Sequence, residues 1–241
     1  MNMKTSTRIA GIIFVALSLI EVTFIALGVE TFHPWLKPLL IPSLAAAALF
    51  ALLPEHKGRQ TTLLACALAF HTLGDILLLL DYLGFIWFAL GLGFFLIGHF
   101  FMLAVILYKM GGLQGWKEIL CWCLPVALAF PAVSFFDAVG AMRYVLIAYA
   151  VTLLFIIASG VLWVLRGRRE GWRIITGGVL FLISDAIVGL NAFNGLDFPL
   201  RHATTMGTYL AADWLLVSGI VLHLLRREGA ERCEKTGLPL D

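Results

Sequence analysis

The chain has 241 residues, of which 61% are hydrophobic and only 13% are charged, with a formal net charge of +2. A soluble domain carries roughly 25% charged residues, so this chain in water would expose far more apolar surface than solubility allows. Four cysteines are too few for a secreted disulfide scaffold, and the scattered basic residues argue against nucleic-acid binding. The composition therefore predicts an all-α, polytopic membrane protein.

Eight stretches are apolar enough to cross a bilayer, which requires about 20 largely apolar residues each. In chain order they cover residues 9–27, 37–53, 62–80, 86–107, 118–135, 143–165, 173–190 and 205–225. The first has the basic flank of a signal peptide, but it carries Glu21 and no convincing cleavage site, so we expect a retained helix. We therefore expect one eight-helix transmembrane domain over residues 1–225, followed by a charged tail over residues 226–241 that frays.

Basic residues are distributed unequally between the two sides of this predicted topology. With both termini on one side, only Lys37, Arg143 and Arg201 lie on the other, so 14 of the 17 Lys and Arg residues share the side of the termini. The positive-inside rule then predicts a multi-pass protein of the cell inner membrane with both termini in the cytoplasm. Asp137 and Asp197 are expected outside.

Ionisable residues are rare inside the spans, where each costs at least a few kcal/mol and is a functional-site candidate. They are Glu21, His71, Asp75, His99, Asp185, Asp213 and His223, with Lys37 at the outer mouth of the second span. The topology places the four carboxylates and Lys37 in one band of the outer half. His71 shares a helix face with Asp75, either as an orienting partner or as an interhelical hydrogen-bond donor. We interpret His223 as interfacial.

The segments around Asp75 and Asp185 are similar to each other. Residues 73–76, with 81–84 beyond them, parallel residues 183–186 with 191–195 beyond them. Both segments lie on odd-numbered spans, four spans apart, which is compatible with an old four-plus-four parallel repeat. The similarity predicts a pocket between two halves, with one aspartate from each.

Several short motifs recur in a fixed order along the chain. They are Lys37-Pro38 with Pro42, Gly74-Asp75, Gly98-His99, Ser184-Asp185 followed by Asn191 and Phe193, and Tyr209-Leu210-Ala211-Ala212. The order and spacing of these motifs, on eight predicted helices, are those of a known family. In these features the chain resembles the YhhN-like lysoplasmalogenase family of integral membrane hydrolases. One departure is Asp213, which stands where the family pattern usually has Gln. It adds a negative charge that bears on substrate preference more than on reaction class.

The resemblance implies hydrolysis of the vinyl ether bond of a lysoplasmalogen, a lysophospholipid, to a fatty aldehyde and glycerophosphocholine or glycerophosphoethanolamine. It also implies that Asp75 and Asp185 are the catalytic aspartates. Protonating a vinyl ether leaves an oxocarbenium ion that water traps, and a buried carboxyl pair supplies both an acid and a base without metal or cofactor. We expect Lys37 to bind the phosphate. The expected remainder of the substrate pocket is Glu21, His99, Asn191, Tyr209 and Asp213.

Two other classes of protein stay open at this point. Carboxylates buried at one depth are equally natural in a proton- or cation-coupled transporter of small molecules or lipids. A zinc-dependent membrane hydrolase would use His71, Asp75 and His99, although zinc sites usually gather three or four ligands into one cluster and the six His here are dispersed.

Overall fold

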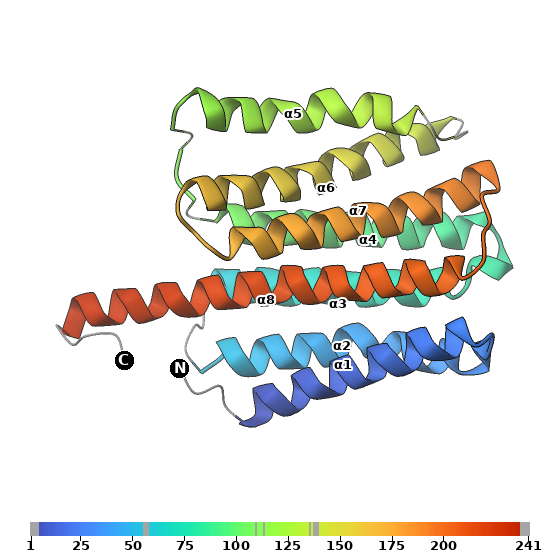
Figure 1. Cartoon of the computed structure of the whole chain (residues 1–241), viewed down its shortest axis with the longest axis horizontal. Helices are drawn as coiled ribbons and strands as arrows, with labels where there is room; N and C mark the ends of the chain where they lie inside the picture. Colours follow the sequence, from blue (N-terminus) through green and yellow to red (C-terminus); the bar gives the residue numbers. More distant parts are fainter. Residues whose placement is uncertain are drawn as a thin grey trace.

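The computed structural model describes residues 5–54, 58–108, 110–112, 114–134, 136 and 140–236. This part of the chain is all-helical, as predicted, and it contains eight α-helices without a β-strand (Figure 1). Their bounds are α1 Thr5–Ala26, α2 His33–Leu52, α3 Arg59–Leu78, α4 Phe85–Leu107, α5 Trp116–Val133, α6 Ala141–Leu165, α7 Gly171–Asn194 and α8 Arg201–Thr236. Two single-turn 3₁₀ helices, η1 Glu30–Phe32 and η2 Asp81–Leu83, lie in the loops that follow α1 and α3.

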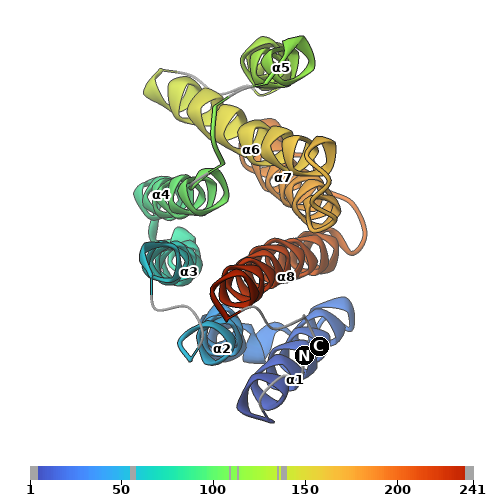
Figure 2. The same ribbon diagram turned by 90° about the vertical axis from the view of Figure 1, so that its left-hand side faces the viewer.

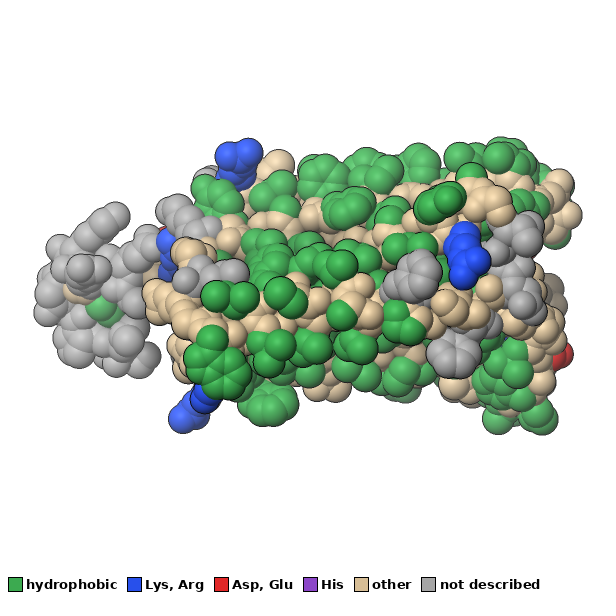
Figure 3. Space-filling view, turned by 90° about the horizontal axis from the view of Figure 1, so that it is seen from above, with side chains coloured by type: hydrophobic (Ala, Val, Ile, Leu, Met, Phe, Trp, Pro, Cys, Tyr) green, Lys and Arg blue, Asp and Glu red, His purple; other side chains and the backbone are tan. Residues whose placement is uncertain are grey.

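The length and surface of these helices fit a bilayer. In the described part of the chain seven helices, α1 to α4 and α6 to α8, are long and apolar enough to span a membrane. Large hydrophobic side chains such as Ile12, Leu19 and Phe100 are exposed on their outer faces. Figure 3 shows many hydrophobic side chains on the face seen from above, spread along the length of the bundle. Exposed apolar surface on this scale identifies a lipid-facing exterior.

The helices pack as two halves of four. Within each half the first helix packs on the second and the third on the fourth, so α3 contacts α4 and α7 contacts α8. Between the halves, α4 contacts α6 and α8 contacts α2, which are equivalent pairs in the two halves. Figure 2 shows α1 and α5 at opposite margins of the bundle. These contacts follow the same order in the two halves and place α3 and α7 in equivalent positions, although α1 also contacts α8.

Glycines let α3 and α4 approach closely next to the buried ionisable residues. A Cβ atom on Gly98 would lie 2.3 Å from His71 Cδ2, and one on Gly74 would lie 2.6 Å from Phe95 Cδ2. The Gly-Asp and Gly-His pairs of the sequence therefore have a steric role: each glycine admits an aromatic or imidazole ring from the neighbouring helix.

Some helices extend further than the apolar stretches suggested. Helix α2 begins at His33 and α7 continues to Asn194, which adds about one turn to each helix at the same end of the bundle. The predicted fraying after Leu225 is not observed, because α8 continues to Thr236. The added segment consists largely of Arg, Glu, Ala and Lys, which favour helix. The predicted exterior residue Asp137 lies outside the described residues, as do Lys4, Lys57, Lys109 and residues 237–241.

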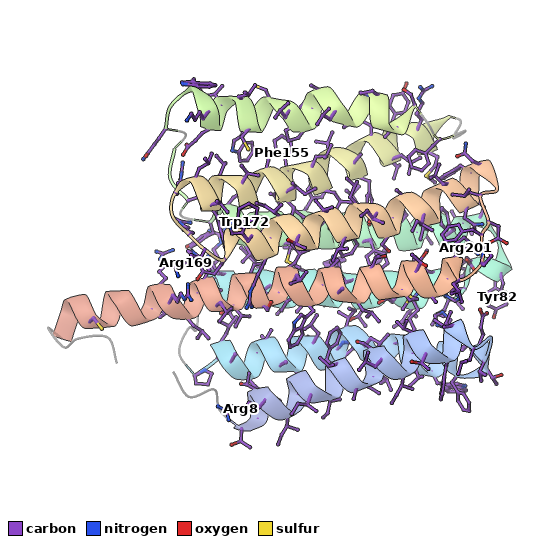
Figure 4. All side chains as sticks on the ribbon, in the orientation of Figure 1. Arg8, Tyr82, Phe155, Arg169, Trp172 and Arg201 are labelled. Atoms are coloured by element: carbon purple, nitrogen blue, oxygen red, sulfur yellow. The ribbon has the colours of Figure 1, made fainter. Side chains whose placement is uncertain are left out.

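Basic side chains concentrate at the end of the bundle where α1 begins and α6 ends. Arg8 and Arg169 lie there, whereas Tyr82 and Arg201 lie at the opposite end (Figure 4). We call these two ends the basic end and the polar-mouth end.

Candidate functional site

Asp75 on α3 is buried between a cation and a hydroxyl group. Its Oδ1 lies 3.6 Å from Lys37 Nζ on α2, and its Oδ2 accepts a 2.7 Å hydrogen bond from the Tyr209 hydroxyl on α8. The carboxyl group is only 1% exposed, and a buried carboxylate is stable only when such partners offset its lost hydration. Three helices from both halves of the bundle thus hold one aspartate.

Asp185 on α7 lies in a different setting, at the wall of an apolar cavity of about 370 Å³. The cavity lies between α4, α6 and α7, and its lining includes Phe88, Phe95 and Phe193. Tyr149 on α6 is the neighbouring hydroxyl group on the same wall. Among the described residues, Asp185 Oδ2 has no hydrogen-bond partner. Asp185 thus lines an apolar cavity beside a tyrosine hydroxyl group, whereas Asp75 has a lysine as its neighbour.

A third aspartate, Asp213 on α8, lies within electrostatic range of both Asp75 and Asp185. A 3.1 Å hydrogen bond joins its Oδ1 to His71 Nδ1 on α3, and both side chains are fully buried. His71 therefore forms an interhelical hydrogen bond, which is one of the two roles expected from its position on the same helix face as Asp75. Asp213 completes a group of three carboxyl groups from α3, α7 and α8.

Aromatic rings separate these polar groups. The Phe181 ring lies 4.4 Å from the His99 ring and 5.5 Å from the Tyr209 ring, measured between centroids. His99 Nδ1 donates to the Phe95 carbonyl across 2.7 Å. His99 is fully buried. Like Asp75, Tyr209 and Asp213, it lies behind the residues that line the apolar cavity and the polar cavity described next, and it is not itself among those residues.

A second cavity of about 1000 Å³ opens at the polar-mouth end. Its polar lining residues are Glu30, His33, Lys37, Asp81, Tyr82, Asn191, Arg201, His202 and Thr205. It shares the wall residues Leu78, Phe88 and Val188 with the apolar cavity. A polar space with Lys37 in its wall therefore adjoins an apolar space with Asp185 in its wall.

Two of the predicted pocket residues have structural partners at this mouth. Glu21 is buried in α1 and pairs with His33, and it is not among the residues that line the polar cavity. The His33 ring packs edge-on against His202, 4.7 Å away. Asn191 does line the cavity, and its side-chain amide donates to the Leu196 carbonyl across 2.8 Å, which closes the end of α7.

The sequence therefore pointed to most of the buried charges but missed some of their neighbours. Tyr149, His33 and His202 were not identified as site residues. The repeat offered one signal for Tyr149: α6 is equivalent to α2, so a polar side chain from α6 beside Asp185 matches Lys37 beside Asp75. In the described part of the chain, no three His, Cys, Asp or Glu side chains are arranged to hold a metal ion.

The apolar exterior, the helix lengths and this enclosed set of ionisable groups define a polytopic membrane protein with a polar site inside the bundle. The model of the YhhN family matches residues 32–220, and the chain belongs to this family. The match includes every predicted site residue except Glu21. Neither a search of curated proteins nor a search of solved structures returns a match.

Proposed function

We propose that this protein is a lysoplasmalogenase-like hydrolase that cleaves the vinyl ether bond of a lysophospholipid inside the bundle. The observation that carries the proposal is the adjacency of the two cavities, one polar and one apolar, with Lys37 and Asp185 in their respective walls. A lysophospholipid has the same division into a charged head and a hydrocarbon chain. The vinyl ether lies at the junction between them.

The two cavities suit the two ends of such a substrate. The apolar cavity, at about 370 Å³, is within the range of small-molecule sites and suits the first part of an alkenyl chain. The polar cavity presents Lys37 to a phosphate. Because Lys37 also reaches Asp75, bound phosphate and the Asp75 carboxylate would share one cation.

The different surroundings of the two aspartates assign their roles in this mechanism. Asp185 faces an apolar cavity without a neighbouring lysine, which favours a neutral, protonated carboxyl group. Asp75 has Lys37 and the Tyr209 hydroxyl, which compensate a carboxylate. We therefore assign Asp185 as the general acid and Asp75 as the general base.

The proposed reaction returns both aspartates to their starting protonation states. Asp185 transfers its proton to the alkenyl carbon distal to the ether oxygen, leaving an oxocarbenium ion. Water adds to the carbon bonded to oxygen while Asp75 takes the water proton, which gives a hemiacetal. Asp75 returns that proton to the glycerol oxygen as the carbon–oxygen bond breaks, and the hemiacetal hydroxyl gives its proton to Asp185. The products are a fatty aldehyde and a glycerophospho-alcohol.

The test is to incubate purified protein with alkenyl-, alkyl- and acyl-lysophospholipids of matched chain length and to measure aldehyde and fatty acid. The proposal expects aldehyde from the alkenyl substrate alone. Fatty acid from the acyl substrate would show a different hydrolase. Absence of any hydrolysis, together with uptake of solute by proteoliposomes, would show a transporter instead.

We also propose that the basic end of the bundle faces the cytoplasm, with the protein in the cell inner membrane. The support is the concentration of arginines at this end of the described bundle. The polar mouth would then open toward the outer leaflet.

A further inference from the structure

A third cavity lies at the basic end, away from the polar mouth. Its volume is about 360 Å³, and it is formed by the tight connection between α6 and α7 and by the adjoining part of α8. Its lining residues are Gly167, Arg168, Arg169, Glu170, His223, Arg226 and Arg227. The lining therefore includes four arginines and one acidic residue.

The lining of this cavity carries more basic than acidic side chains. Glu170 is buried and pairs with Arg226. Burial lowers the pKa of the Arg168 guanidinium, and the nearby positive charges of Arg166 and Arg227 lower it further. Arg168 and Arg227 are partly buried, whereas Arg169 and Arg226 are exposed. Like charges held near one another repel, so an anion among them would be favoured.

Backbone and ring contacts hold the wall of the cavity around Arg168 in place. The Arg168 backbone N–H donates to the Trp163 carbonyl across 2.8 Å, and its guanidinium lies 5.7 Å from the Trp163 ring centroid. The His223 ring of α8 packs on the same indole at 4.3 Å. A Cβ atom on Gly171 would lie 2.5 Å from the Gly160 carbonyl oxygen, so α6 and α7 are in close contact just below the loop. The cavity is thus a fixed feature of three packed helices.

We infer that this arginine cavity binds the phosphate of an anionic phospholipid from the adjacent leaflet. Guanidinium groups bind phosphate oxygens in bidentate geometry, and basic pockets between transmembrane helices accept anionic lipid head groups. The cavity lies where the apolar spans α6 and α7 meet their connecting loop, which is the depth of lipid head groups. It is separate from the proposed hydrolytic site, so the inference does not depend on that function.

The experiment uses the full chain in neutral detergent micelles containing phosphatidylglycerol or, for comparison, phosphatidylcholine. Native mass spectrometry gives the lipid bound, and thermal unfolding gives the stabilisation. We expect phosphatidylglycerol to be retained in preference to phosphatidylcholine. Arg168→Gln and Arg169→Gln should each weaken it about fivefold, since one basic residue near an anionic surface contributes about 1 kcal/mol.

Arg8→Gln is the matched control, because it removes the same charge from the same end of the bundle at an exposed position in α1 that does not line the cavity. It should leave lipid binding unchanged. Arg169 is exposed, so its variant keeps the test informative even if Arg168→Gln folds poorly. Equal binding of both lipids, or equal weakening by Arg8→Gln, would overturn the inference. If inorganic phosphate, at the same concentration as the lipid, abolishes lipid binding completely, the cavity would be assigned to soluble phosphate instead.

Discussion

The Tyr209 hydroxyl on α8 donates to Asp75 Oδ2 on α3 across 2.7 Å, and this hydrogen bond joins the last helix of one half to the third helix of the other. Tyr209 is also packed edge-on against Phe95 and Phe181, at 5.8 Å and 5.5 Å between ring centroids. Its ring therefore belongs to the core, while its hydroxyl orients the carboxylate that we assign as the base.

Tyr209→Phe separates these two contributions. The ring contacts stay, so the variant should fold, although the lost buried hydrogen bond should lower its melting temperature. Loss of a hydrogen bond to a charged group costs about 1.5–3 kcal/mol, so we expect aldehyde release to fall by about 10- to 100-fold. Turnover that matches the wild type would show that Asp75 does not need this donor.

Asp75→Asn and Asp185→Asn test the carboxyl pair itself. Each keeps side-chain size but removes the titratable group, and general acid–base catalysis contributes about 10²–10⁴-fold, so each should lose at least about 100-fold in turnover. The double variant should lose much less than the product of the single losses, because the two groups act as a unit. Asp197→Asn, at a side chain that is 75% exposed, is the control and should stay active. Near-native aldehyde release from Asp75→Asn or Asp185→Asn would contradict the mechanism.

Asp213→Gln tests whether the third aspartate is catalytic or structural. Glutamine carries the oxygen needed to accept from His71 Nδ1, so we expect a folded enzyme that stays active, with at most a change in substrate preference. Asp213→Leu should instead destabilise the fold by about 1–3 kcal/mol, because His71 would remain buried without its partner. Loss of activity in the folded Gln variant, measured by aldehyde release, would place Asp213 in the catalytic group.

The contrast between Asp75 and Glu21 shows how far the sequence can go. A charged residue in an apolar run has an identifiable depth, and this predicted a common band for Lys37, Asp75 and Asp213. Depth does not give the direction of a side chain around the helix axis. Glu21 was therefore expected in the pocket, whereas α1 packs so that Glu21 faces His33.

Tyr149 is a site residue that the sequence could not identify. One hydroxyl in an apolar span looks like any interior tyrosine, and only the packing of α6 beside α7 places it next to Asp185. His33 was missed for a related reason, because the apolar stretch suggested that α2 begins at residue 37. The four residues that precede this position form the first helical turn, and two of them, His33 and Pro34, line the polar cavity.

The predicted orientation can be measured in intact cells. Asp197→Cys, at the polar-mouth end, should react with a membrane-impermeant maleimide, while native Cys233 at the far end of α8 should react only after permeabilisation. This pattern follows from the arginine concentration at the basic end. The reverse pattern would place the polar mouth in the cytoplasm and the arginine cavity in the outer leaflet.

The close contact at Gly98 gives a steric test of the site. A Cβ atom there would lie 2.3 Å from His71 Cδ2 and 2.8 Å from His71 Nε2. Because His71 is fully buried and hydrogen-bonded to Asp213, its ring cannot move without losing that bond. Gly98→Ala should therefore destabilise the protein by about 1–3 kcal/mol, as overpacking of a core does, and should lower aldehyde release.

Gly93→Ala is the matched control on the same helix, since nothing lies within 4 Å of a Cβ atom at that position. Replacing a helical glycine by alanine adds helix propensity of about 1 kcal/mol, so this variant should melt at the same temperature or higher. Thermal unfolding of both variants in the same detergent makes the comparison. If Gly98→Ala has the same melting temperature as Gly93→Ala, the ring of His71 has room to shift. Its hydrogen bond to Asp213 would then not be a fixed part of the site.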